Sequence, residues 1–231
     1  NDASLTLVGD MGANALTAPV LFFAKTRGSA GGSTVVSDGD RLGAIFFNAG
    51  DGTDIESVAA SIDSVIDGTP GSNDTPGRLV FRTSSDGSGD NTERMRIDSS
   101  GKVGIGTGSD SLTRELTVKL AGQADVSIVG ATDQYAQLLF GDTDADNKGI
   151  VAYDNTNDKL ELWTSGAAAF RVDANGHVTM PKQTAFLVTP STAQNNIDIN
   201  ANRTIEFGTE IYDVNGDFAS HVFTAPVTGK Y

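Results

Sequence analysis

Apolar and polar residues alternate in short runs along much of this 231-residue chain. In one run Met95 and Ile97 alternate with charged residues, and Val103 and Ile105 continue the alternation beyond Gly101. A period of two residues is that of a β-strand, whose successive side chains point to opposite faces. The run therefore predicts a β-hairpin with one apolar face, which needs cover from a neighbouring repeat or a neighbouring subunit.

A second alternating run has the same form around its turn. It passes through Asn175-Gly176, the dipeptide that most strongly favours a short hairpin because both residues tolerate positive φ. We expect Asp98 and Gly101 to be the turn residues of the first hairpin, and Asn175 and Gly176 those of the second.

These hairpins are the last of five sequence blocks that occur twice in the same order, with longer spacings in the first copy. The paired blocks are residues 3–9 with 124–130, 21–26 with 138–143, 43–47 with 149–153, 78–84 with 159–165, and 95–103 with 170–178. Five collinear matches indicate one supersecondary unit used twice, with loops accounting for the length differences. The alternative is accidental similarity among short strands.

Residues 54–67 fit two periods. A helical face would contain Ile55, Val58, Ala59, Ile62, Val65 and Ile66, whereas a strand face would contain Ala60, Ile62, Ser64 and Ile66. β-Branched residues and serine lower the helix propensity of the segment, but the pattern leaves both interpretations open.

The composition favours an all-β fold. The chain has 27 Gly but only 11 Phe, 4 Tyr and 1 Trp, as expected for many short strands joined by turns. The blocks predict a first repeat module at residues 1–110 and a second, shorter one at 111–182. The repeat is gone from Gln183 onward, so we expect a separate β domain at 183–231. Because the sequence begins with Asn1 and its last motif stops at Tyr231, we interpret it as a piece of a longer polypeptide.

Charge and residue content exclude several classes of protein. Sixteen basic against thirty acidic residues give a net charge of −14, which argues against a nucleic-acid partner because phosphate recognition needs basic patches. The absence of cysteine excludes disulfide bonds and thiol chemistry. The longest apolar run, residues 20–24, is far short of the roughly 20 residues of a membrane-spanning helix.

The first hairpin resembles a known family. The run from Thr92 to Thr107, which reads TERMRIDSSGKVGIGT, is similar to the recurring shaft motif of bacteriophage tail-fibre proteins. Residues 39–47 and 75–83 resemble the segments that precede that motif. The second copy matches loosely, with Val178-Thr179-Met180 where the family pattern has Val-Gly-Ile. This resemblance covers roughly residues 1–182.

A second resemblance begins near Ala185. The segments 205–207, 212–218 and 223–231 are similar to the first part of a complement-type globular head. That family folds as a trimeric jelly roll related to the tumour-necrosis-factor group, and its remaining strands are missing from this sequence.

Together the two resemblances imply an elongated homotrimeric β fibre of short strands and hairpins that carries the beginning of a C-terminal jelly-roll head. The implied function is that of a structural and adhesive virion tail-fibre protein, without catalysis or cofactors, that projects a receptor-binding tip towards the host cell. Its partners would be two further copies, other tail or fibre proteins, and a host cell-surface glycan or protein. The alternatives are an extracellular or cell-surface adhesin or filament subunit of a bacterium, and a polysaccharide-depolymerising tailspike.

Few residues form a local chemical motif. Asp142, Asp144 and Asp146 have the alternate oxygen ligands with which a calcium loop begins, so they are weak candidates for a structural divalent cation, although an acidic turn explains them as well. The glycines of residues 101–106 lack the spacing of a phosphate loop and favour close approach of strands. The two histidines, His177 and His221, are too far apart in sequence to form a local metal motif.

Overall fold

The computed structural model describes residues 6, 19–29, 31–195, 200, 202 and 204–226. This part of the chain contains 15 β-strands and no helix, so the prediction of an all-β fold is confirmed. No helix in the described part is long and apolar enough to cross a membrane. The chain divides into two compact units, residues 1–125 and residues 126–231.

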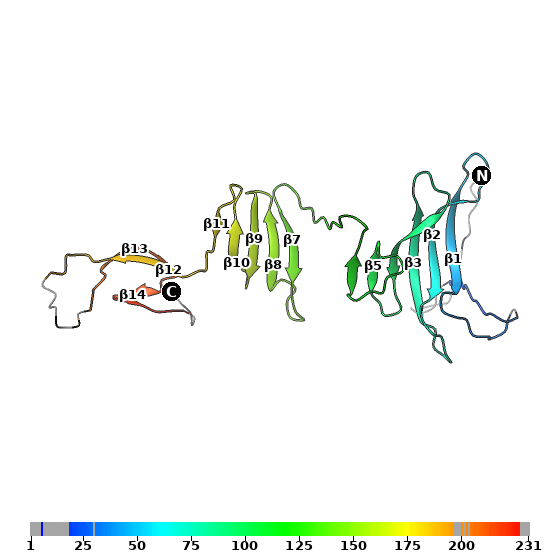
Figure 1. Ribbon diagram of the computed structural model, residues 1–231, viewed down its shortest axis with the longest axis horizontal. Helices are drawn as coiled ribbons and strands as arrows, with labels where there is room; N and C mark the ends of the chain where they lie inside the picture. The colour runs from blue at the N-terminus through cyan, green and yellow to red at the C-terminus, as the bar shows by residue number, and fades with distance from the viewer. Residues whose placement is uncertain are drawn as a thin grey trace. The chain divides into compact units, whose positions relative to one another are not determined.

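The first unit contains one six-stranded sheet, a single layer in which the strands follow chain order (Figure 1). Its strands are β1 (Arg41–Ala49), β2 (Ser57–Ile66), β3 (Gly77–Ser84), β4 (Asn91–Ile97), β5 (Val103–Ile105) and β6 (Leu116–Val118). All neighbouring strands are antiparallel except β5 and β6, which are parallel. The ambiguous residues 54–67 contain strand β2, which pairs on both sides, so the helical interpretation is wrong.

The second unit contains a five-stranded antiparallel sheet and two small hairpins. The larger sheet is formed by β7 (Tyr135–Phe140), β8 (Gly149–Asp154), β9 (Lys159–Thr164), β10 (Ala167–Val172) and β11 (Val178–Thr179). The hairpins are β12 (Ala185–Thr189) with β13 (Thr209–Val214), and β14 (Phe218–Ala219) with β15 (Val222–Phe223). The jelly-roll head expected in this region stays a prediction.

The repeat blocks fall on corresponding strands of the two larger sheets. The third block lies in β1 and β8, the fourth in β3 and β9, and the fifth in the hairpins β4–β5 and β10–β11. The first unit has an additional strand, β2, between its third and fourth blocks. The second block is strand β7 in the second unit but lies outside the strands in the first, and the first copy of the opening block is almost wholly outside the described residues.

The hairpins of the fifth block have the same turn. In each, an aspartate carboxylate, Asp98 or Asp173, accepts hydrogen bonds from backbone amides two and four residues further on. The glycine three residues after it, Gly101 or Gly176, has φ of +82° in both. Asn175 does not have positive φ. The turn is therefore a four-residue turn closed by a glycine, and not the mirror-image turn that Asn-Gly favours.

The segment after β5 folds back over one face of the first sheet. Thr107 and Leu112 are buried there, and a Cβ atom built on Gly104 would lie 2.4 Å from Thr107 Oγ1. Glycine at this position therefore permits the close approach. The segment ends in β6, so the expected module boundary after residue 110 falls between two paired strands, whereas the boundary between the compact units follows Asp125.

Gly176→Val should destabilise the protein through the backbone alone, since no atom lies within 4 Å of the position of an added Cβ. A β-branched residue at this φ costs about 2 kcal/mol, which lowers the midpoint of thermal unfolding by roughly 5 °C. Gly89→Val is the matched control, because Gly89 also has open space around it but lacks positive φ. Equal melting curves for the two variants would contradict the turn geometry.

Candidate functional site

Cross-strand partners in the first sheet place its large apolar residues on one face. One row of partners runs Ile45, Ile62, Phe81, Met95, Ile105 and Val118, and the next runs Gly43, Ser64, Leu79, Ile97, Val103 and Leu116. Directly opposed residues share a face of the sheet, so these rows form one apolar surface across all six strands. We call it the first apolar face.

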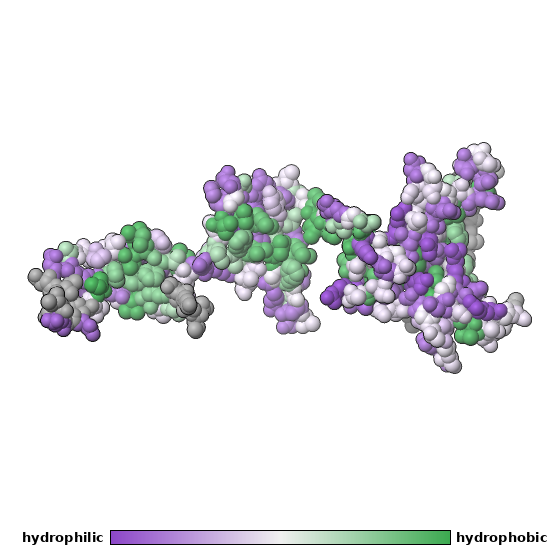
Figure 2. All heavy atoms as spheres, in the orientation of Figure 1, coloured by the Kyte–Doolittle hydropathy of each residue, from purple (hydrophilic) through white to green (hydrophobic). Residues whose placement is uncertain are grey.

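The second sheet has an equivalent surface. One row of partners runs Leu138, Val151, Leu162 and Phe170, and the next runs Ala136, Tyr153, Leu160, Val172 and Val178. We call it the second apolar face. Figure 2 shows apolar residues gathered over this sheet, with hydrophilic residues at the loops that join its strands.

The repeat seen in the sequence is a repeat of these faces. The matched pairs are Ile45 with Val151, Leu79 with Leu160, Phe81 with Leu162, Met95 with Phe170, Ile97 with Val172, and Val103 with Val178. Both members of every pair lie on an apolar face. The two copies therefore have corresponding apolar faces as well as corresponding strands.

Large parts of both faces are exposed to solvent. Leu138, Val151, Tyr153, Leu160, Leu162 and Val178 are between 37% and 56% exposed. On the first apolar face, the exposed fraction reaches 61% at Leu116. An apolar surface of this extent marks an interaction site, because isolated soluble chains rarely expose such continuous patches.

The total accessible surface of the chain leads to the same conclusion. The chain exposes 17285 Å², whereas a compact monomer of its mass, 23.9 kDa, exposes about 9,900 Å². The excess of roughly 7,400 Å² exceeds the surface that one partner contributes to an ordinary interface, about 800 Å². The chain thus has enough uncovered surface for an obligate association.

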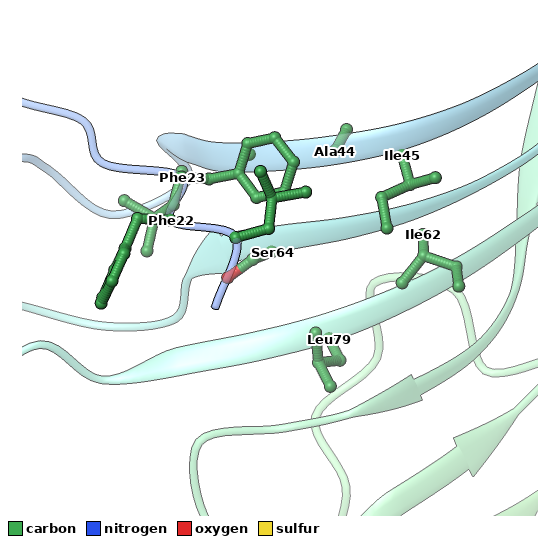
Figure 3. A pocket seen from close by; sticks show the side chains of 10 residues that line it. Phe22, Phe23, Ala44, Ile45, Ile62, Ser64 and Leu79 are labelled. Carbon is green, nitrogen blue, oxygen red and sulfur yellow. The ribbon is translucent and has the colours of Figure 1, made fainter. Parts of the chain in front are cut away.

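A shallow cavity lies on the first apolar face, where the segment before β1 crosses the sheet. It has a volume of about 360 Å³, and no charged residue lines it. Figure 3 shows Ile45, Ile62 and Leu79 projecting into it from three adjacent strands, with Phe22 and Phe23 at its other end. Phe23 covers Gly43 so closely that a Cβ atom on the glycine would lie 2.6 Å from the Cβ of Phe23.

The opposite face of the first sheet carries its ion-paired charged side chains, together with Phe46, which is 46% exposed. Asp63 is fully buried, and its Oδ2 atom accepts a hydrogen bond from Arg82 Nε at 2.7 Å. Arg96 forms a bidentate ion pair with Glu93 on the same sheet. Val80, the cross-strand partner of Asp63 and Arg96 on this face, is also fully buried.

The opposite face of the second sheet also pairs a buried carboxylate with an arginine, and Leu139 on the same face is 47% exposed. Glu161 is 3% exposed and accepts hydrogen bonds from Arg171 Nε at 2.6 Å and from Trp163 Nε1 at 2.8 Å. The Trp163 ring in turn packs edge-on against Tyr135. Each sheet therefore has one face with a buried carboxylate paired with arginine, and one apolar face that the described chain leaves largely exposed.

The sequence did not lead us to Asp63 or Glu161. A strand pattern shows which residues share a face, but it does not distinguish a solvated charge from a buried one. The available signal was an acidic residue inside a central strand, next to Ile62 for Asp63 and between two leucines for Glu161, together with an arginine on another strand.

The aspartates proposed for a cation form a turn whose first carboxylate has internal partners. The backbone amides of Asp144 and Ala145 donate to Asp142 Oδ1, each at 3.0 Å, and they hold the pKa of the Asp142 carboxyl below its ordinary value. Lys148 lies 3.5 Å from the other oxygen. Within the described ranges, no three His, Cys, Asp or Glu side chains are grouped so that they could hold a metal ion.

The other polar candidates also make local contacts. Lys102, in the glycine-rich segment, donates to the carbonyl oxygen of Leu112 at 2.9 Å. His177 contacts Asp173 in its own turn, and His221 contacts the carbonyl oxygen of Phe207.

In the C-terminal hairpins, Phe186 stacks on Phe218 and Phe223 with ring centroids 5.3 and 4.7 Å apart.

The geometry is that of an all-β modular protein whose sheets are single layers. The chain is similar to two solved structures of the carboxy-terminal domain of the bacteriophage T5 L-shaped tail fibre. One, which includes its intramolecular chaperone domain, is 12% identical with a TM-score of 0.44, and the match covers 90% of this chain and 69% of that one. The other is 14% identical with a TM-score of 0.43, covering 94% and 100%. No protein-family model and no curated protein matches the chain.

Ile97→Asp should abolish self-association, because the variant would place a carboxylate in the middle of the first apolar face. Light scattering of the full chain would then give the mass of one chain. Ser109→Asp is the control, since it adds the same charge at an exposed loop position. If the Ile97 variant keeps the mass of the unmodified protein, the first apolar face is not the contact surface.

Arg171→Leu should destabilise the second unit, because it leaves the Glu161 carboxylate buried without a cationic partner. We expect a loss of about 3 kcal/mol in the free energy of unfolding, at the low end for buried pairs because Arg171 is itself 42% exposed. The double variant Glu161→Leu/Arg171→Leu should recover most of this loss. Denaturant unfolding of both variants tests the pair, and equal losses would show that the unpaired charge is not the cause.

Proposed function

We propose that this chain is a structural subunit of a bacteriophage tail fibre, and that three copies associate through the two apolar faces. The observation that carries the proposal is the difference between the two faces of each sheet. One face is closed by its own arginine–carboxylate pairs, whereas the other exposes a continuous apolar surface. Association of copies is the means by which a single-layer sheet buries such a face.

Threefold association is favoured by the sequence motifs. Both families that the chain resembles, the tail-fibre shafts and the complement-type heads, form trimers. Three sheets around an axis direct three apolar faces inward, so that each face packs against two others and the polar faces point to solvent. The net charge of −14 fits this orientation, because the acidic residues then lie on the outside and keep the assembly soluble.

The biological role that follows is attachment to a host cell from the tail of the virion. The repeat modules would provide reach, and the C-terminal residues would begin the head that contacts a cell-surface glycan or protein. Three copies of a weak contact at one tip give usable avidity, so adhesion needs no catalytic step. Other tail or fibre proteins would hold the assembly on the virion, and a structural divalent cation near the threefold axis is compatible with this arrangement.

The absolute mass of the full chain in solution tests the proposal. Light scattering should give three times the chain mass, and the value should persist on dilution because an interface of several thousand Å² does not dissociate readily. A folded monomer would contradict the fibre assignment and favour a bacterial adhesin built from independent modules. A dimer would retain the apolar contact but reject the threefold axis.

A further inference from the structure

The segment that precedes β7, residues 123–130, is extended and apolar but belongs to no strand. Val126 is 74% exposed, Ile128 49% and Val129 86%. The backbone amides and carbonyls of residues 123–130 make no hydrogen bond to any other described part of the chain. The segment is therefore an uncovered apolar stretch whose backbone is also unpaired.

Its sequence is that of a strand and not of a flexible linker. Ala124, Val126 and Ile128 alternate with Asp125 and Ser127, which is the period-two pattern of a half-buried strand. Three of its residues are β-branched and apolar, it contains no proline, and it has a single charge. Flexible linkers, in contrast, are rich in glycine, serine or charged residues.

The second sheet offers a free edge of matching length. Strand β7, Tyr135–Phe140, pairs with β8 on one side only, in a regular register without a bulge. It contains no charged residue and no proline, the features by which sheet edges are normally protected from pairing with other chains. The other edge of the sheet, β11, is only two residues long and offers far fewer backbone groups for pairing.

The segment does not pair with β7 of its own chain, although it lies next to it in sequence. Residues 131–134 form a turn in which Gln134 N donates to Ala131 O. Asn155 Nδ2 donates to the carbonyl oxygens of Ala131 and Gln134. Gly130 lies against the start of β7, with an added Cβ only 2.7 Å from Tyr135 O. Among the described residues of one chain, neither the segment nor the free edge of β7 has a strand partner.

We propose that residues 124–129 form a β-strand with the free edge of β7 in a second copy of the chain. The inference rests on the proposed function, because it requires self-association. The alternation puts Val126 and Ile128 on one side, so that a register aligned with Ala136 and Leu138 makes them an extension of the second apolar face. The same pairing supplies partners for the free backbone groups of two segments at once.

Hydrogen exchange of the assembled full chain, followed by mass spectrometry, tests the donor segment. The alternate amides of residues 125–129 that point towards β7 should exchange at least about tenfold more slowly than those of the polar loop at residues 85–90. Ser127→Pro should remove this protection, because proline cannot donate to a strand ladder, whereas Ser127→Ala should retain it. Exchange of residues 125–129 at the rate of the loop, in a protein that has assembled, would overturn the proposal.

Disulfide cross-linking tests the partner strand. The chain has no cysteine, so in the double variant Ser127→Cys/Gln137→Cys only the two introduced thiols can form a disulfide. Both substitutions fall on the side of the strands away from the apolar face. Mild oxidation should join different chains covalently on a non-reducing gel, whereas the control pair Ser127→Cys/Ser109→Cys should stay unlinked. A disulfide within one chain, or no disulfide, would contradict pairing between copies.

The outcomes separate this inference from the proposed function. A monomeric mass would reject both. An assembled protein with rapid exchange at residues 125–129 and no cross-link between chains would reject only the intermolecular strand and leave the apolar faces as the contact surface.

Discussion

The structure depends on the fact that a single-layer sheet has two faces, and that the described part of the chain leaves the apolar face of each larger sheet largely exposed. In both larger sheets the cross-strand registers place the long aliphatic and aromatic side chains together, and the described chain folds little over them. A layer of strands needs a second layer to form a core. The exposed apolar residues of the two faces show that the described chain does not supply such a layer on that side.

The opposite faces explain why association would use the apolar side. Asp63 and Glu161 are buried, and each is held by an arginine that lies across the sheet. Such pairs add little to stability compared with apolar packing, but they keep charged groups on this face. Packing another layer on that side would desolvate Arg82 and Arg171 without replacing their water contacts. The ion pairs thus select the orientation of the sheets more than they stabilise them.

Much of this fold followed from the sequence, because alternation directly reports which residues share a face of a strand. Met95, Ile97, Val103 and Ile105 were predicted to share one, and the registers place all four together. Alternation was insufficient at residues 54–67, where β-branched residues also fit a helix, and only the pairing of β2 on both sides resolved the choice. The burial of Asp63 and Glu161 depends on arginines far away in sequence, which a local pattern does not contain.

Strand β2, which has no counterpart in the second unit, changes the direction of the chain between the third and fourth blocks. Inserting two strands as a hairpin would not change the direction of the strands that follow. A single inserted strand does change it: β1 and β3 run parallel, because each is antiparallel to β2. In the second unit the corresponding strands, β8 and β9, are direct antiparallel neighbours. The segment before β1 consequently joins the sheet at the end opposite to the one that it would reach without β2. Its residues Leu21–Phe23 lie across Gly43, whereas β7 extends the sheet of the second unit. The longer spacing between the third and fourth blocks of the first unit therefore changes the direction of the chain as well as its length.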